Sequence, residues 1–193
     1  MMRKLWLVLL VAAATGAQAQ DATGVVKLNP WGAIVGQYQL GYEHFISERT
    51  SIQLTPGAVF SSVSLLAAND TLVTAGSVGA KRSGIILIPE VRYYLGDNAP
   101  TGVYAAVFGR YRDVTTTLDD DPASTQTRSA VGGGFVLGYQ HKLANGLVGD
   151  IFIGPQFKQT DTRSTGNFDD YAFTLEEASD TGIRFGINIG FGF

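Results

Sequence analysis

The chain ends in "GIRFGINIGFGF", residues 182–193, where every second residue is apolar and most of the intervening residues are glycine. Side chains alternate between the two faces of a β-strand, so this period of two predicts a strand with one apolar face and one small or polar face. The apolar face carries the odd-numbered residues and ends at Phe193. The fold therefore depends on which solvent each face of such a strand meets.

The N-terminus predicts the cellular compartment. Arg3 and Lys4 precede the apolar run "LWLVLLVAAA" (5–14), and "AQA" (17–19) has the small-residue pattern that precedes signal-peptidase cleavage. We therefore expect residues 1–19 to be a signal peptide and residues 20–193 to form the folded domain. The run is too short to cross about 30 Å of hydrocarbon as a helix. The chain has no cysteine, which excludes disulfides and a lipid anchor on cysteine.

The composition favours a barrel in lipid over a soluble domain. Charged residues make up only 16% of the chain, and 24 of 193 residues are glycine. Residues 20–193 hold twelve Lys and Arg against 17 Asp and Glu, a net charge of −5, so no nucleic-acid partner is expected. No apolar stretch after the signal peptide reaches the length of a membrane-spanning helix. A closed barrel with a lipid-facing outer surface reconciles low charge with short alternating segments.

Eight segments with this alternation predict an all-β fold, an up-and-down antiparallel barrel of eight transmembrane strands in one domain, without helices. The predicted strands are 24–33, 36–46, 51–63, 82–96, 101–115, 128–143, 147–161 and 181–193. Tight turns at 47–50, 96–100 and 144–146 alternate with long polar connections at 64–81, 116–127 and 162–180. Outer-membrane barrels have short periplasmic turns and long extracellular loops, so both termini are expected at the periplasmic rim.

Charged residues fall repeatedly on one face of these segments, which predicts that this face lines the interior. The reverse arrangement, as in a soluble lipocalin-like barrel, would give water a glycine-rich surface with little charge. Eight strands enclose room for side chains but not for a water channel, so the acidic groups should pair with the basic ones as a plug. The expected interior charges are Lys27, Glu43, Glu90, Arg92, Arg110, Arg112, Asp150, Lys158 and Arg184.

The terminal "FGINIGFGF" resembles the assembly signal of bacterial outer-membrane barrels, with Phe191 and Phe193 as its aromatic residues. Residues 26–54, 88–111 and 184–193 resemble a family of small outer-membrane β-barrel proteins of Gram-negative bacteria. The resemblance implies a cell outer membrane location and insertion by the barrel assembly machinery, and it implies no activity. One position departs from the pattern, because the signal often has glycine where this chain has Asn188.

Three tyrosines are expected to face outward near the periplasmic rim as an aromatic girdle: Tyr42, Tyr93 and Tyr139. The glycine-rich "VGGGFVLG" (131–138) is not a nucleotide-binding loop, because no helix is predicted after it. The partners expected are outer-membrane lipid and lipopolysaccharide, and a monomer without a cofactor or metal is favoured. The function expected is a structural role or binding and adhesion through the loops.

Two alternatives remain open at this stage. A lipid-modifying enzyme embedded in the barrel would need a nucleophile and a histidine base near the outer leaflet. The two histidines, His44 and His141, instead precede short turns and point outward by parity, so no enzyme is expected. The second alternative is a narrow ion path along the interior charges, although large conductance requires many more strands.

Overall fold

The computed structural model describes residues 23–67, 77–96, 99–168, 171–172 and 180–193. The signal peptide expected at 1–19 therefore lies outside the described residues. The elements, in chain order, are β1 (Gly24–Leu28), α1 (Pro30–Ile34), β2 (Gln37–Phe45), β3 (Thr50–Ala67), β4 (Ser77–Tyr94), β5 (Gly102–Leu118), β6 (Thr125–Lys142), β7 (Leu147–Thr165), β8 (Tyr171–Ala172) and β9 (Thr181–Gly192).

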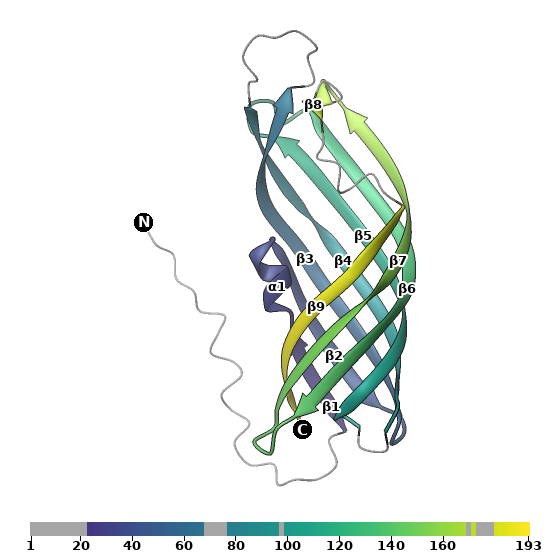
Figure 1. Ribbon diagram of the computed structural model, residues 1–193. Helices are drawn as coiled ribbons and strands as arrows, with labels where there is room; N and C mark the ends of the chain where they lie inside the picture. Colours follow the sequence, from purple (N-terminus) through teal and green to yellow (C-terminus); the bar gives the residue numbers. More distant parts are fainter. Residues whose placement is uncertain (1–22, 68–76, 97–98, 169–170, 173–179) are drawn as a thin grey trace.

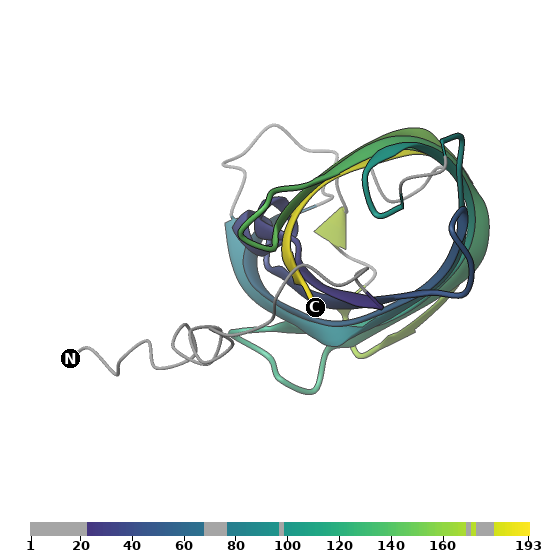
Figure 2. The same ribbon diagram turned by 90° about the horizontal axis from the view of Figure 1, so that it is seen from below.

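Eight of these strands close into one antiparallel barrel. The order along the sheet is β2-β1-β9-β7-β6-β5-β4-β3, and a pairing between β2 and β3 completes the ring. The two-residue β8 only adds to the end of β3. Figure 1 shows the strands tilted around a common axis, and Figure 2 shows the closed ring from the end that carries the C-terminus. The predicted eight-stranded up-and-down barrel is confirmed.

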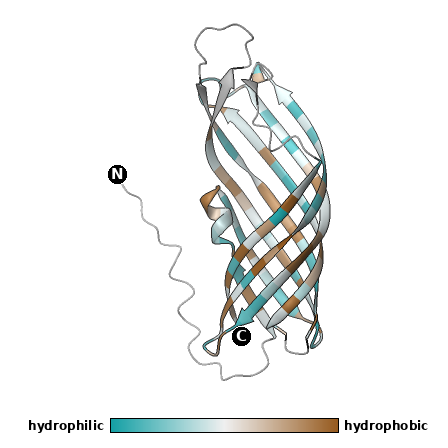
Figure 3. Ribbon diagram, in the orientation of Figure 1, coloured by the Kyte–Doolittle hydropathy of each residue, from teal (hydrophilic) through white to brown (hydrophobic). Residues whose placement is uncertain are grey.

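The two faces of the wall differ in polarity along every long strand. In β9, for example, Ile183 and Phe185 are 68% and 55% exposed, whereas Asn188 on the other face is 8% exposed. Apolar bands alternate with polar ones around the barrel in Figure 3. The odd-numbered side chains of residues 182–193 thus point outward, and the glycines and polar residues between them point into the barrel.

The structure corrects the first predicted strand. Residues 24–33 were expected to form one strand, but β1 ends at Leu28 and α1 follows it. The Asn29 side chain accepts a 2.8 Å hydrogen bond from the N–H of Gly32, and Pro30 occupies the first turn. Asn is a favoured N-cap and Pro a favoured first helical residue. A helix of five residues is too short to show a 3.6-residue period, so the sequence pattern did not reveal it.

Helix α1 lies against the outside of the wall (Figures 1 and 2). The ring of Trp31 lies 5.9 Å from that of Phe185 on β9, and both side chains are about half exposed. No helix among the described residues is long and apolar enough to cross a membrane.

The structure also corrects the ends of the long strands. Parts of the predicted loops 64–81, 116–127 and 162–180 are strand, because β3 continues to Ala67, β6 begins at Thr125 and β7 continues to Thr165. At the ends of β5, β6 and β7 the apolar alternation is replaced by threonine-rich sequence, and the β-branched side chain of threonine still favours strands. Hydroxyl groups pair across them, with 2.9 Å between Thr125 and Thr165.

The ring closes where β1 meets β9, along a seam of only four residue pairs that runs from Val25 opposite Gly192 to Leu28 opposite Ile189. The last residue extends it, because the N–H of Phe193 donates to the carbonyl of Gly24 at 3.0 Å and its carbonyl accepts from Thr23 and Gly24. By comparison, β7 pairs with β9 over eleven residues, from Leu147 to Phe157.

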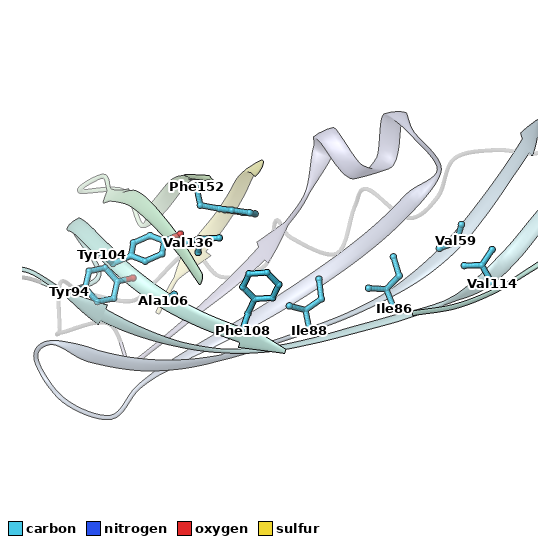
Figure 4. Packing of buried hydrophobic residues seen from close by; sticks show 10 residues of the cluster. All are labelled: Val59, Ile86, Ile88, Tyr94, Tyr104, Ala106, Phe108, Val114, Val136 and Phe152. Atoms are coloured by element: carbon cyan, nitrogen blue, oxygen red, sulfur yellow. The ribbon is translucent and has the colours of Figure 1, made fainter. Parts of the chain in front are cut away.

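Side chains fill much of the barrel interior. The apolar ones form a line from the tyrosines near the end with the short turns toward Val59 and Val114 (Figure 4). Tyr94 and Tyr104 are fully buried, and their rings lie 5.5 Å apart. The charged interior residues gather at the level of these two tyrosines.

Candidate functional site

The candidate site is an interior ion network close to the short-turn rim, the end of the barrel that carries the turns after β2, β4 and β6 and the C-terminus. Lys27 on β1 contacts Glu43 on β2, and its ammonium lies 3.3 Å from the carboxylate of Asp150 on β7. All three side chains are at most 2% exposed. The odd-numbered residues of β1 and β2 and the even-numbered residues of β7 face the interior, and these three side chains are among them.

A second set of ion pairs continues the network toward the middle of the barrel. The guanidinium of Arg92 lies 3.1 Å from Asp150 and 2.6 Å from Glu90. Glu90 also accepts from Arg184 on β9 at 2.8 Å. The network therefore alternates three cations with three carboxylates and has no net formal charge. Such pairing, with further hydrogen bonds, is the condition under which charges are tolerated in a buried space.

Neutral side chains complete the network, and their part in it was not predicted from the sequence. The Tyr104 hydroxyl donates to Asp150 at 2.7 Å, and the Tyr94 hydroxyl donates to Glu43 at 2.8 Å. The Asn188 amide also donates to Asp150, at 3.0 Å. Asn188 is the position that departs from the glycine of the assembly pattern, so this departure supplies a hydrogen-bond donor to a buried carboxylate. Inward parity was the signal that could have identified these residues.

Gln140 on β6 lies at the centre of this part of the network. Its carbonyl oxygen accepts from Lys27 and from Arg92, and its amide donates to Glu43 at 3.2 Å. Aromatic rings flank the arginines, with the Arg92 guanidinium 4.4 Å from the centre of the Tyr104 ring. Arg184 lies 4.3 Å from the centre of the Phe108 ring, a cation–π distance. Gln140 thus links residues of β1, β2 and β4 at this level of the interior.

Three of the expected interior charges, Arg110, Arg112 and Lys158, lie elsewhere. Arg110 and Arg112 face inward, but they belong to a second group farther from the short-turn rim, where Arg110 donates to the carbonyl oxygen of Gln156 at 3.1 Å. The three carboxylates of the network lie nearer the short-turn rim than Arg110 and Arg112, since Glu90 lies opposite Phe108 in the strand register. Lys158, also expected inside, belongs to the second group.

This second group surrounds a cavity of about 40 Å³. Its described wall residues come from β5, β6 and β7: Arg110, Arg112, Arg128, Ala130, Gly132, Gly133, Gln156, Phe157, Lys158 and Thr160. Among these described residues, four are cationic and none is acidic. The interior therefore has a neutral layer near the short-turn rim and a basic cavity beyond it.

The three girdle tyrosines lie on the outer surface near the short-turn rim. Tyr42, Tyr93 and Tyr139 are 45%, 49% and 47% exposed. The ring of Tyr42 lies beside that of His44, and the ring of Tyr139 stacks on that of His141, each pair with centroids 6.4 Å apart. Both histidines are therefore on the outer face.

Phe193 is 51% exposed at the same rim, and the neighbouring Phe191 is partly buried. Val26 on β1 and Leu147 on β7 lie opposite Phe191 in the two adjoining ladders. Both aromatic residues of the expected assembly signal thus belong to the strand that closes the ring. Among the residues that the structure describes, no group of His, Asp and Glu side chains is arranged to hold a metal ion.

Comparison with known proteins adds a structural likeness. No family model matches the chain, and no curated protein matches it. Among solved structures, the crystal structure of Acinetobacter baumannii CarO is similar over 92% of this chain and 100% of the other, with a TM-score of 0.47 and 10% sequence identity.

Proposed function

We propose that this chain is a small outer-membrane barrel of a Gram-negative bacterium, closed to ions by its interior network and carrying any binding or adhesion on the opposite rim. The ion network is the observation that supports a closed barrel. Each of its three carboxylates contacts two cations or a cation and a hydroxyl donor. These carboxylates therefore have few acceptor sites left to bind a permeating ion. Such a barrel acts as a scaffold rather than as a porin.

The outer wall supports the location in a membrane. Large apolar side chains such as Leu87, Val107 and Ile153 are 40% to 62% exposed around the ring. A continuous apolar surface of this kind is typical of lipid-facing barrels and would be a liability in water. We further propose that the short-turn rim is periplasmic, that the chain is a monomer, and that it is inserted by the barrel assembly machinery into a bilayer with lipopolysaccharide. The proposed family is that of small outer-membrane barrels.

The embedded-enzyme alternative has no geometric support at the histidines. Both His44 and His141 lie on the outer face near the short-turn rim, beside tyrosine rings. A histidine base for lipid chemistry would need to lie at the outer leaflet with a nucleophile beside it. We therefore propose no catalytic role.

The experiment that tests this proposal is conductance in planar lipid bilayers. At neutral pH the purified folded chain should produce no steady channels of porin size, and a trimeric porin in the same bilayer serves as the positive control. Steady, voltage-independent steps from the parent protein would contradict a closed barrel. Separately, the folded chain should fractionate with outer membranes and migrate differently in detergent gels before and after boiling.

A further inference from the structure

We propose that a groove on the outer wall, crossing β2, β3, β4 and β5, binds one acyl chain of a phospholipid. The groove has a volume of about 560 Å³, which lies within the roughly 300–1,000 Å³ typical of small-molecule sites. The inference rests on the proposed membrane location, because a wall in lipid is where acyl chains meet this surface. It goes beyond that location, since it assigns a retained lipid to one place on the wall.

Two rows of outward-facing residues, each crossing the four strands, form the sides of the groove. One row consists of Tyr42, Leu54, Pro89 and Gly109, and the other of His44, Ile52, Val91 and Val107. Between the rows, Gln53, Glu90 and Phe108 turn buried side chains into the barrel, so the main chain of the wall forms the floor. The groove therefore has aliphatic sides along most of its length.

Gly109 and Pro89 form the end of the groove on β4 and β5, and neither residue is a good choice for a strand in the middle of a sheet. A Cβ at Gly109 would lie 3.5 Å from the Cγ of Pro89, an ordinary contact, so packing within the chain does not require glycine here. Pro89 cannot donate to the ladder between β4 and β5. Glycine in a strand costs stability, and this one leaves the end of the groove open.

The other end of the groove is polar and lies at the short-turn rim. His44 directly precedes the last residue of β2, and its ring lies 6.4 Å from that of Tyr42. The phenol and the imidazole can both hydrogen-bond to ester or phosphate oxygens at the headgroup level. Gly109 instead lies within the outward apolar residues of β5, which run from Val103 to Tyr111. The lipid headgroup is therefore assigned to the end at His44, and the acyl chain extends toward Gly109.

The test is native mass spectrometry of the folded, full-length mature chain, released from detergent micelles that contain palmitoyl-oleoyl phosphatidylethanolamine. The parent should retain one phospholipid per chain and bind it saturably. Gly109→Ile should weaken binding roughly tenfold or more, since each methylene group kept out of an apolar site costs several-fold in affinity. The matched control is Gly149→Ile, at an exposed glycine of β7 where a Cβ meets nothing within 4 Å. Each variant is checked for folding by its gel shift before heating.

A second arm tests the direction of the lipid in the groove. His44→Leu should weaken binding about fivefold, as expected for the loss of one hydrogen bond. His141→Leu is its control, because His141 is the other outward histidine and also lies beside a tyrosine ring, away from the groove. Equal affinity of the two histidine variants would overturn the assignment of the headgroup to His44.

Three results would overturn the proposal as a whole. These are no lipid retained by the parent, equal retention by the parent and Gly109→Ile, and retention of lipid A in place of the phospholipid when both are offered. The membrane location is tested separately by fractionation with outer membranes. A parent that fractionates with outer membranes but retains no phospholipid would therefore overturn the groove alone, and conductance tests the closed barrel independently.

Discussion

Glu90 illustrates how much one interior residue holds together. It comes from β4 and accepts from Arg92 on the same strand and from Arg184 on β9, across the barrel. The Glu90 side chain is buried, so water cannot replace its carboxylate as the acceptor for either arginine. Such a carboxylate balances two cations that would otherwise remain buried without it.

Replacing Glu90 with alanine should therefore destabilise the barrel. Removing one member of a buried ion pair costs about 3 to 5 kcal/mol, because the remaining charge is left uncompensated. The free energy of unfolding in detergent, measured by denaturant titration, should fall by this amount. Glu48→Ala is the control, since Glu48 is exposed in the turn between β2 and β3 and its loss should change little. Equal stability of the two variants would contradict the network as described.

At this scale the sequence predicted charge better than it predicted hydrogen bonding. The alternation along each strand predicted that Lys27, Asp150 and the other ionic residues face the interior. A charged side chain facing lipid is costly, so charged residues identify the inward face of a strand. The residue types of Tyr104 and Asn188 do not identify their face, since tyrosine and asparagine occur on either face. The alternation also does not give the position of a residue along the barrel axis, so it could not separate the arginines of the cavity from those of the network.

At the scale of elements, α1 gives the barrel a natural spectroscopic probe. The chain has two tryptophans, Trp6 and Trp31, and only Trp31 lies within residues 20–193. Trp31 is 46% exposed on the outer face of the wall, beside Phe185. If this face meets lipid, its emission should be blue-shifted in bilayers and quenched by lipids brominated on their acyl chains.

The control for this measurement is a water-soluble quencher such as iodide, which should quench the bilayer-inserted chain only weakly. Trp31→Phe should abolish the tryptophan signal and leave the fold intact, because the aromatic contact with Phe185 is retained. Strong quenching by iodide together with weak quenching by brominated lipid would place α1 in water.

Strands were predicted well where lipid imposes the period, and poorly where it does not. The central parts of β3 to β7 alternate strictly, because one face must be apolar. Beyond the apolar band, β5, β6 and β7 continue through threonine-rich segments without that constraint, so their ends were missed. Helix α1 was missed for a different reason, since its Asn29 cap and Pro30 are a signal at the start of a helix rather than a periodicity.

At the scale of the whole molecule, the C-terminal residue has separate roles in assembly and in stability. The Phe193 backbone bonds to Thr23 and Gly24, while its ring is half exposed at the rim. Phe193→Ala keeps the backbone bonds and removes only a partly buried ring, which costs about 1 to 3 kcal/mol. If the insertion machinery recognises Phe193 as part of an assembly signal, the same substitution should reduce assembly in cells far more than this loss of stability would.

Surface-assembled protein in cells should therefore fall sharply in Phe193→Ala, while the purified variant refolds in detergent with modestly lower stability. Quantitative blotting of outer-membrane fractions and denaturant titration measure the two effects. Ile183→Ala on the same strand is the control, because it is a lipid-facing residue outside the terminal signal. Normal assembly of Phe193→Ala would leave the C-terminal sequence as an ordinary lipid-facing strand.

The closing seam between β1 and β9 should limit the stability of the whole ring. Val26 lies opposite Phe191 across it, and the chain has no other cysteine to interfere with a designed pair. Oxidised Val26→Cys, Phe191→Cys should raise the free energy of unfolding by about 2 to 4 kcal/mol. The same variant kept reduced is the control, and no difference between the two forms would show that unfolding begins elsewhere.

A wall that is held by four residue pairs on one flank of β1 and five on the other has a defined mechanical weak point. Force applied through the N-terminus acts directly on β1, whose ladders are the shortest in the wall. The first rupture should release β1 by itself and convert the ring into an open curved sheet, with β9 and β2 as its edges. In hydrogen exchange, the amides of β1 should accordingly exchange before those of β5 and β6, which are paired along most of their length.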